Sequence, residues 1–197
     1  MSKPDLAIFD LDNTILNGDS DYSMINYLVD INLLDKAAKS KNDEFIKDYQ
    51  QGQLDFNQYT NFALKPYIGK TQDEINKIIL PFVEEIIEPM INVFALKLIH
   101  GHHDKGDTIL LASATNELIV KPIAQRLSIN HVIGTKVEFK NNQCSGEYIP
   151  PSALGVGKLK LVERWMKAHQ YDDFSGVTFY SDSINDLPLL EEVEFPK

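Results

Sequence analysis

Leu6–Thr14, which reads LAIFDLDNT, is the stretch that decides the fold expected for this chain. Its first four residues form an apolar run of the length of a buried parallel strand. Asp10 and Asp12 follow directly, and side chains two residues apart at a strand end point to the same side. Two like charges held close usually share a proton or a cation. The stretch therefore predicts a hard divalent metal beside a nucleophile and an acid/base group, with a plain polar turn as the alternative.

Three further segments follow in order along the chain. Residues 108–115 (TILLASAT) form a second apolar run that ends on small hydroxyl residues, and 155–158 (GVGK) opens a helical pattern. Residues 177–186 (VTFYSDSIND) form a third strand-like run that ends in carboxylates. Strands that alternate with helices predict an α/β fold with a doubly wound parallel sheet. The site of such a sheet lies beyond the carboxyl ends of its strands, where Asp10 and Asp182 fall.

This order of segments resembles the haloacid dehalogenase-like (HAD) phosphohydrolases, and within them the phosphoserine-phosphatase-like and histidinol-phosphatase-like branch. The family motifs are DxDxT, a strand ending in Ser or Thr, a Lys, and DxxND. The matching residues are, in motif order, Asp10, Asp12 and Thr14; Ser113; Lys158; and Asp182, Asn185 and Asp186. The resemblance implies a Rossmann-like core of residues 1–17 and 88–197, with a helical cap at 18–87. Helical spacing of apolar residues from 21 to about 88 agrees with such a cap.

The resemblance also implies hydrolysis of a phosphate monoester through an aspartyl-phosphate intermediate. Asp10 would be the nucleophile, and Asp12 would protonate the leaving oxygen and then deprotonate the attacking water. Ser113 would hydrogen-bond the phosphoryl group, and Lys158 would pair with it and with Asp10. A cation is needed there because an anionic nucleophile must approach an anionic ester.

Mg²⁺ is the cofactor that the resemblance implies, and it suits a site made of oxygen ligands. The ion would be held by the Asp10 and Asp182 carboxylates and by the Asp12 backbone carbonyl. Asp186 would act through water or orient the other ligands. The supporting residues would be Thr14 and Asn185.

The substrate expected from the resemblance is a small phosphate ester that carries an amine. In phosphoserine phosphatases an acidic residue, here Asp19, binds the substrate ammonium and a cap arginine binds its carboxylate. Ala63 stands at the position of that arginine, and no arginine occurs between Met1 and Gln125. The segments GDSD at 18–21 and SATN at 113–116 resemble proteins assigned as histidinol-phosphate phosphatases. We therefore favour histidinol phosphate. Phosphoserine hydrolysis, phosphoryl transfer to an alcohol, and a non-catalytic module that binds phospho-ligands or a protein are the alternatives.

Charge, hydropathy and cysteine content limit the partners and the cellular location that we expect for the protein. A net charge of −10 over 197 residues argues against nucleic acid or an anionic membrane as partner. The N-terminus lacks a signal-peptide pattern, no apolar stretch approaches membrane-span length, and the single cysteine, Cys144, fits a reducing cytoplasm. Near a predicted helix end lie three histidines, His100, His102 and His103, which interact favourably with the helix dipole there. A zinc site is the less favoured interpretation, because no paired Cys or further ligand follows at the spacing typical of zinc sites.

The chain ends at Lys197, soon after the fourth motif. Family members continue with another strand, which here would begin near Phe195. We therefore expect the C-terminal strand to be missing, which would leave strand 177–180 at a sheet edge with unpaired backbone groups. The expected consequence is lower stability, or self-association or another partner that covers this edge.

Overall fold

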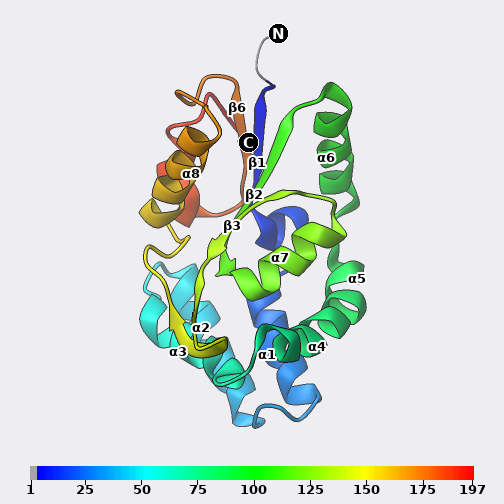
Figure 1. The fold of residues 1–197 in the computed structure, drawn as a ribbon, viewed down its shortest axis with the longest axis vertical. Helices are drawn as coiled ribbons and strands as arrows, with labels where there is room; N and C mark the ends of the chain where they lie inside the picture. The colour runs from blue at the N-terminus through cyan, green and yellow to red at the C-terminus, as the bar shows by residue number, and fades with distance from the viewer. Residues whose placement is uncertain (1–3) are drawn as a thin grey trace.

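The computed structural model describes residues 4–197, and its centre is a parallel sheet with helices on both faces (Figure 1). The strands lie in the order β3-β2-β1-β6-β7, and every pairing between neighbours is parallel. The predicted doubly wound sheet is thus confirmed. The strands are β1 Leu6–Phe9, β2 Thr108–Asn116, β3 His131–Thr135, β6 Val177–Tyr180 and β7 Phe195–Pro196. The helices beside the sheet are α6 Val93–Lys105, α7 Glu117–Arg126, α8 Val156–Ala168 and α9 Leu187–Leu190.

Strand β1 is the central strand, and all four of its side chains are buried. Successive side chains of a strand point to opposite faces, so an uninterrupted apolar run has to be covered on both. Ala7 and Phe9 belong to the larger core cluster, which includes residues of α6 and α7. Leu6 and Ile8 belong to the second cluster, which includes residues of α8 and α9. The first strand of the sequence therefore holds the two layers of helices together.

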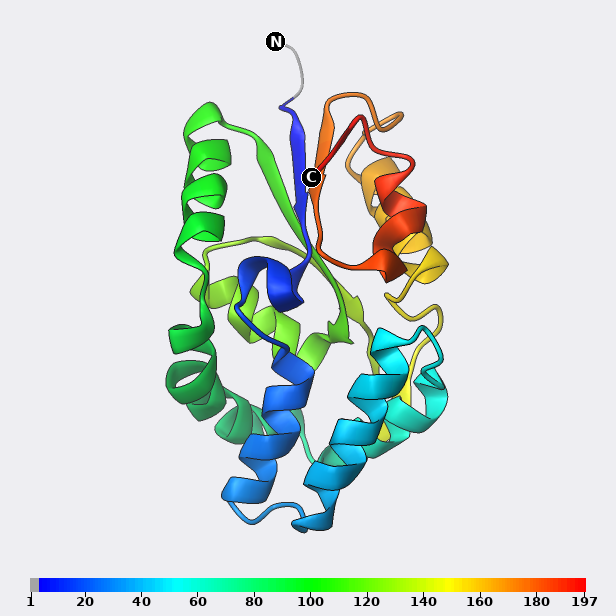
Figure 2. The ribbon, with the colours of Figure 1, turned by 180° about the vertical axis from the view of Figure 1, so that it is seen from behind.

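The helices between β1 and α6 gather at the end of the sheet where β1 ends (Figure 2). As predicted, no strand lies between residues 18 and 87. The two chain segments that connect these helices to the sheet run side by side, because Asn17 N donates to Met90 O over 2.7 Å and Asn92 N donates to Ile15 O over 2.8 Å. This pairing supports the proposal that the helices form an inserted cap. They are α1 Ser20–Asp30, α2 Ala37–Gln50, α3 Phe56–Leu64, η2 Lys65–Tyr67, α4 Gln72–Phe82, η3 Val83–Ile87 and α5 Glu88–Met90.

Residues 136–148 (KVEFKNNQCSGEY) predict a hairpin with its turn at Asn141-Asn142. The structure confirms it as a two-stranded hairpin, β4 Val137–Lys140 and β5 Gln143–Tyr148. The turn at 141–142 has positive φ angles of 51° and 63°, which asparagine tolerates. The hairpin is hydrogen-bonded to residues of the predicted cap, 18–87. Tyr148 Oη donates to Asn57 Oδ1 over 2.9 Å, and Cys144 N donates to Lys70 O over 2.8 Å. We therefore propose that the hairpin supports the cap, although its residues follow β3.

The expectation that the C-terminal strand is missing is wrong. Phe195 and Pro196 form β7, which pairs with Thr178 and Phe179 of β6. Lys197 N also donates to Phe179 O over 2.9 Å. Strand β6 therefore lies between β1 and β7, and the unpaired edge expected at 177–180 does not exist. The expectations of lower stability and of self-association through that edge lose their basis.

Two predicted helix boundaries are also corrected. The sequence pattern predicts one helix that starts at Pro89 and runs toward Lys105, where Gly106 ends it. In the structure this helix is broken, because Asn92 has extended backbone and its side chain accepts from Phe94 N over 2.9 Å, which caps α6. The sequence pattern also predicts a last helix over residues 187–193, whereas α9 ends at Leu190. In the described residues 4–197, no helix has both the length and the apolarity to cross a membrane.

His102 is buried near the end of α6 and uses both ring nitrogens in contacts. Nδ1 lies 2.7 Å from Asp107 Oδ2, and Nε2 lies 3.1 Å from Tyr180 Oη. We expect His102→Ala to lower the free energy of unfolding by about 2–3 kcal/mol, since it leaves a cavity and takes a hydrogen-bond partner from each of two half-buried polar groups, Asp107 and Tyr180. Denaturant unfolding tests this, with the exposed His103→Ala as the control. Equal stabilities of the two variants would contradict the prediction.

Candidate active site

A pocket of about 680 Å³, counted to its open mouth, lies between the carboxyl ends of the central strands and the cap helices α1, α2 and α3. Its lining contains five aspartates and one lysine: Asp10, Asp12, Asp19, Asp21, Asp182 and Lys158. No arginine or histidine is among the described residues that line it. The excess of carboxylates favours ligands that carry a positive charge. Lys158 can in addition pair with a negatively charged group of the same ligand.

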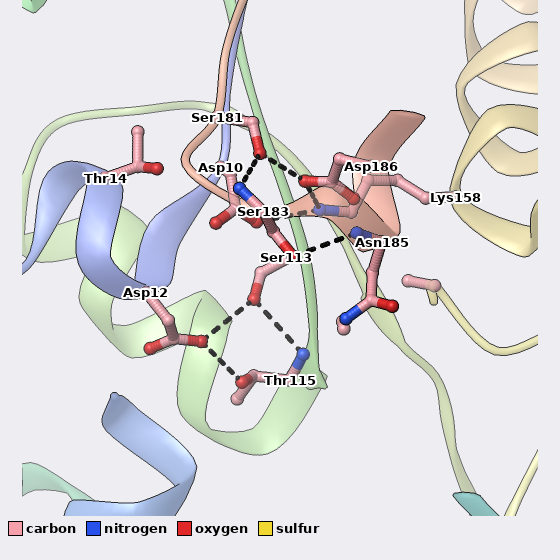
Figure 3. A network of polar contacts seen from close by, with 12 residues as sticks. Asp10, Asp12, Thr14, Ser113, Thr115, Lys158, Ser181, Ser183, Asn185 and Asp186 are labelled. Carbon is pink, nitrogen blue, oxygen red and sulfur yellow. Dashed lines mark hydrogen bonds and ion pairs between the residues drawn. The ribbon is translucent and has the colours of Figure 1, made fainter. Parts of the chain in front are cut away.

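The deepest contact joins Asp10 at the end of β1 to Lys158 in the first turn of α8 (Figure 3). Lys158 is 2% exposed, and its Nζ donates to Asp10 Oδ1 over 2.8 Å and to Asp186 Oδ2 over 2.7 Å. Ser181 Oγ also donates to Asp186 Oδ2 over 2.7 Å. A buried lysine is tolerated only when it is paired in this way. The three charged groups therefore form one buried unit.

The protonation of this unit follows from its burial. Burial raises the pKa of Asp10 to about 7, and Lys158 opposes this shift while the charges of Asp186 and Asp12 add to it. Burial lowers the pKa of Lys158, but the charges of Asp10 and Asp186 outweigh it and leave the net shift upward. Lys158 is thus the cation of the site near neutral pH. A further cation placed near Asp10 would lower its pKa and so favour its ionised form.

Asp12 is held by the start of α1 and by the end of β2. Its Oδ1 accepts from Ser20 N over 2.6 Å, and its Oδ2 accepts from Thr115 Oγ1 over 2.9 Å and from Ser113 Oγ over 3.5 Å (Figure 3). Burial raises the pKa of Asp12 to about 7, and the charge of Asp19 acts in the same direction. A carboxyl group with this pKa can both give and take a proton near pH 7.

Asp182 is exposed at the end of β6 and is positioned by Thr14. Thr14 Oγ1 donates to Asp182 Oδ1 over 3.2 Å, and Asp182 N donates to Thr14 Oγ1 over 3.2 Å. Asn185 lines the neighbouring open groove, and its backbone N donates to Ser183 Oγ over 3.2 Å. Of the residues predicted from sequence, Asp10, Asp12, Asp19, Ser113, Lys158 and Asp182 thus line the pocket, while Thr14, Asn185 and Asp186 lie beside it.

Asp19 caps the first turn of α1, where its Oδ1 accepts from Tyr22 N over 2.7 Å. It also lines the pocket. Burial raises its pKa to about 6, and the hydrogen bond from Tyr22 opposes this shift. Asp19 is therefore a carboxylate at neutral pH that faces the ligand space without a basic partner among the lining residues.

Several pocket residues carry no sequence motif of their own. Thr115 supplies the closest side-chain donor to Asp12, and Tyr49 of α2 reaches Ser183 with 3.3 Å between the hydroxyl oxygens. Asp21 lies within the GDSD segment, but the sequence assigns it no role. Its position two residues after Asp19, near a helix start, is the one available signal. The aromatic lining residues come from the cap, and they are Phe45, Tyr49, Phe56 and Tyr59.

The oxygen atoms at the end of β1 and β6 fit a magnesium ion. Asp10 and Asp12 follow β1, Asp182 follows the adjacent β6, and the implied ligand set is two carboxylates and one backbone carbonyl. Mg²⁺ typically takes one or two protein carboxylates and keeps several waters. In residues 4–197 no three side chains of His, Cys, Asp or Glu are grouped as a metal cage. The implied set, with only two carboxylates, does not require such a group.

Acidic residues and a buried lysine at the carboxyl edge of a doubly wound sheet define an α/β enzyme that acts on a charged small molecule. Comparison with known proteins narrows this class. Residues 7–191 match the model of the haloacid dehalogenase-like hydrolases, and the chain belongs to this family. The predicted family is confirmed.

Similar proteins agree with this assignment. A histidinol-phosphatase from Neisseria meningitidis serogroup C (strain 8013) is 36% identical over 195 residues, which cover 97% of this chain and 88% of the relative. A crystal structure of a protein with unknown function from Bordetella pertussis Tohama I has a TM-score of 0.89 at 31% identity, over 99% of this chain and 89% of that one. A substrate-bound phosphoserine phosphatase shares the fold, with a TM-score of 0.70 at 14% identity over 100% and 86% of the two chains. The chain is therefore an enzyme of the HAD phosphatase type.

Proposed function

We propose that the protein hydrolyses a small, amine-bearing phosphate monoester through an aspartyl-phosphate intermediate, and that histidinol phosphate is its favoured substrate. The buried contact between Lys158 and Asp10 is the observation that carries the proposal. It places a fixed cation beside a carboxylate at the end of the central strand, which is what in-line attack on an anionic ester requires. The similarity to a protein named histidinol-phosphatase supports the choice of substrate.

In the first step, a carboxylate oxygen of Asp10 forms a bond to phosphorus while the bond to the leaving alkoxide breaks. Asp12 donates its proton to that alkoxide, and its pKa of about 7 suits this transfer. In the second step, Asp12 takes a proton from water, which attacks the phosphorus and releases Asp10. Hydrogen bonds from Ser20 and Thr115 hold Asp12 in place during both transfers.

The phosphoryl group is bound by Ser113 and Lys158, which both line the pocket. Mg²⁺, when bound, supplies positive charge that neutralises the phosphoryl oxygens. Asp10, Asp182 and the Asp12 carbonyl would hold it. Asp186 already accepts from Lys158 and Ser181, so its main proposed role is to orient the lysine, with contact to the metal only through water.

The substrate class follows from the charges around the reacting groups. Asp19 is a carboxylate without a basic partner in the lining and is suited to an ammonium group. A substrate carboxylate finds no arginine in the described lining, and Ala63 at the position expected for one has no charge. Histidinol phosphate carries an amine and lacks a carboxylate, which favours it over phosphoserine.

The test is Mg²⁺-dependent phosphate release from histidinol phosphate, phosphoserine and an aryl phosphate. We expect kcat/KM for histidinol phosphate to exceed that for phosphoserine by at least about 100-fold, the scale on which an unpaired buried charge is rejected. EDTA should abolish release and Mg²⁺ restore it. Phosphate appearing on an added alcohol would instead indicate a phosphotransferase. Tight ligand binding by folded protein without turnover would indicate a binding module.

A further inference from the structure

Thr135, the last residue of β3, joins two separate segments of the core through its hydroxyl group. Its Oγ1 donates to Ala114 O over 2.7 Å and accepts from Ala153 N over 3.0 Å. One hydroxyl can make both contacts, because it has a proton to donate and lone pairs that accept. Thr135 is 1% exposed and Ala153 is fully buried, so bulk water does not compete for these bonds. The hydroxyl therefore ties β2 to the loop 149–155, which connects β5 to α8.

The first of these segments carries Ser113, which lines the active-site pocket. Ala114 directly follows Ser113 near the end of β2. Thr115 N donates to Ser113 Oγ over 3.1 Å, so the Ser113 hydroxyl is held against the same stretch of backbone (Figure 3). The hydrogen bond from Thr135 to the Ala114 carbonyl therefore restrains the part of the chain that places the Ser113 hydroxyl.

The second segment leads to Lys158. The loop 149–155 runs directly into the first turn of α8, where Lys158 N donates to Gly155 O over 3.0 Å. A Cβ atom added at Gly157 would lie 2.0 Å from Ser152 O, so the loop lies directly against the start of the helix. Groups packed this closely do not shift independently. The position of the loop therefore affects the position of the Lys158 backbone.

A purely structural role for Thr135 is the alternative, since its hydroxyl satisfies two backbone groups and stabilises the fold by this alone. The structure favours a further role because of what the two segments carry. Ser113 and Lys158 are the side chains proposed to bind the phosphoryl group, and Thr135 lies between the segments that hold them. A displacement of about 1 Å in such groups can cost about 100-fold in rate.

We propose that Thr135 is a positioning residue, which sets the distance between the Ser113 hydroxyl and the Lys158 ammonium group. This role rests on the proposed function and adds to its phosphoryl-binding site a residue outside the sequence motifs. Thr135 is not among the described residues that line the active-site pocket, so it acts through the backbone of the two segments. Its loss should weaken phosphoryl binding and slow phosphoryl transfer, in addition to any loss of stability.

The first test compares Thr135→Val with Thr135→Ser. Valine keeps nearly the shape of threonine without the hydroxyl, whereas serine keeps the hydroxyl. In Thr135→Val we expect kcat per folded molecule, with the best ester of the panel above, to fall about 10- to 100-fold. The Kd for inorganic phosphate, measured by calorimetry with Mg²⁺ present, should rise about 10-fold. Thr135→Ser retains both hydrogen bonds and should stay within about threefold of wild type in both quantities.

Thr60→Val is the matched control for the loss of a buried hydroxyl. Thr60 is 5% exposed on the cap helix α3, and its Oγ1 donates to Phe56 O over 2.7 Å within the same helix. The substitution touches neither of the segments that Thr135 joins. We therefore expect kcat per folded molecule and the Kd for phosphate to stay unchanged, with folded fractions taken from denaturant unfolding.

A second pair of variants displaces the loop without changing Thr135. Gly157→Ala places a Cβ against Ser152 O and forces the loop and the start of α8 apart, so we expect the same losses of kcat and of phosphate affinity. Gly101→Ala is the matched control, because a Cβ at this position of α6 meets nothing within 4 Å. It should leave both quantities unchanged.

A Thr135→Val protein that keeps kcat and the Kd for phosphate within about twofold of wild type, whatever its stability, would overturn the positioning role. Equal losses in Thr135→Val and Thr135→Ser would also overturn it, because the hydroxyl would then not be responsible. Absence of phosphate release from every ester by wild-type protein would refute the proposed function, while the phosphate titrations would still decide on Thr135. If Thr135→Val does not fold, Gly157→Ala decides by the same measurements.

Discussion

Asp10→Asn is expected to reduce kcat by at least about 10⁴-fold, as removal of a nucleophile does in enzymes with covalent intermediates. The amide has nearly the shape of the carboxylate, and Lys158 keeps its contact with Asp186. Because burial raises the pKa of Asp10 to about 7, its ionised form opposes folding at neutral pH, and a neutral amide removes this cost. We therefore expect the free energy of unfolding to stay the same or to rise.

The measurement is single-turnover phosphate release with histidinol phosphate, combined with denaturant unfolding. Acid-quenched wild-type protein should carry a phosphoryl group at Asp10 that hydroxylamine removes, and Asp10→Asn should carry none. Asp104→Asn, an exposed substitution on α6, controls for the loss of one negative charge. Activity above about 1% of wild type in Asp10→Asn would rule out the aspartyl-phosphate mechanism.

Lys158→Met is expected to lower both activity and stability. The substitution leaves Asp10 and Asp186 buried side by side without their cation, a change that typically costs about 3–5 kcal/mol. It also removes the cation proposed to bind the phosphoryl group, and loss of such a group typically lowers kcat by about 10²- to 10³-fold. Lys160→Met, at an exposed position one half-turn further along α8, is the matched control and should change neither quantity.

The pH dependence separates these two effects of Lys158→Met. Lys158 lowers the pKa of Asp10, so its removal moves that pKa further above about 7 and leaves the nucleophile protonated at neutral pH. Relative activity of the variant should therefore recover as pH rises from 7 to 9. Its stability should change in the opposite sense, because a carboxyl group whose pKa is raised by folding binds its proton more tightly in the folded state and loses stability as pH rises. A deficit in activity that is constant from pH 6 to 9 would contradict the proposed pairing with Asp10.

The elements that the sequence predicted well are those in which the local pattern and the tertiary environment agree. The apolar run of β1 needs cover on both faces wherever it lies, so its place in a parallel sheet follows from composition alone. Thr71 followed three residues later by Glu74 predicts a capping box, and the structure has one at the start of α4, since both partners lie within one helical turn. The break at Asn92 was missed because a capping asparagine and a helical one look alike in sequence.

The C-terminal strand was missed for a different reason. Two residues carry no periodic pattern, and β7 exists only because the neighbouring strand β6 offers free backbone groups to Phe195 and Pro196. A hydrogen-bond ladder between distant segments is a property of the folded chain. Length alone therefore gave the wrong expectation for this edge of the sheet.

By itself, the sequence determined the chemistry of this protein: a pair of aspartates after a buried strand, a hydroxyl, a lysine and an acidic loop, in an order that places them at the same edge of a parallel sheet. Only the tertiary structure decided the depth at which these groups lie and what surrounds them. Burial, which raises the pKa values of Asp10, Asp12 and Asp21 to about 7, depends on the packing of cap helices against strand ends. The pocket depends on it as well, because Asp10, Tyr49 and Lys158 belong to three separate segments that meet only after folding.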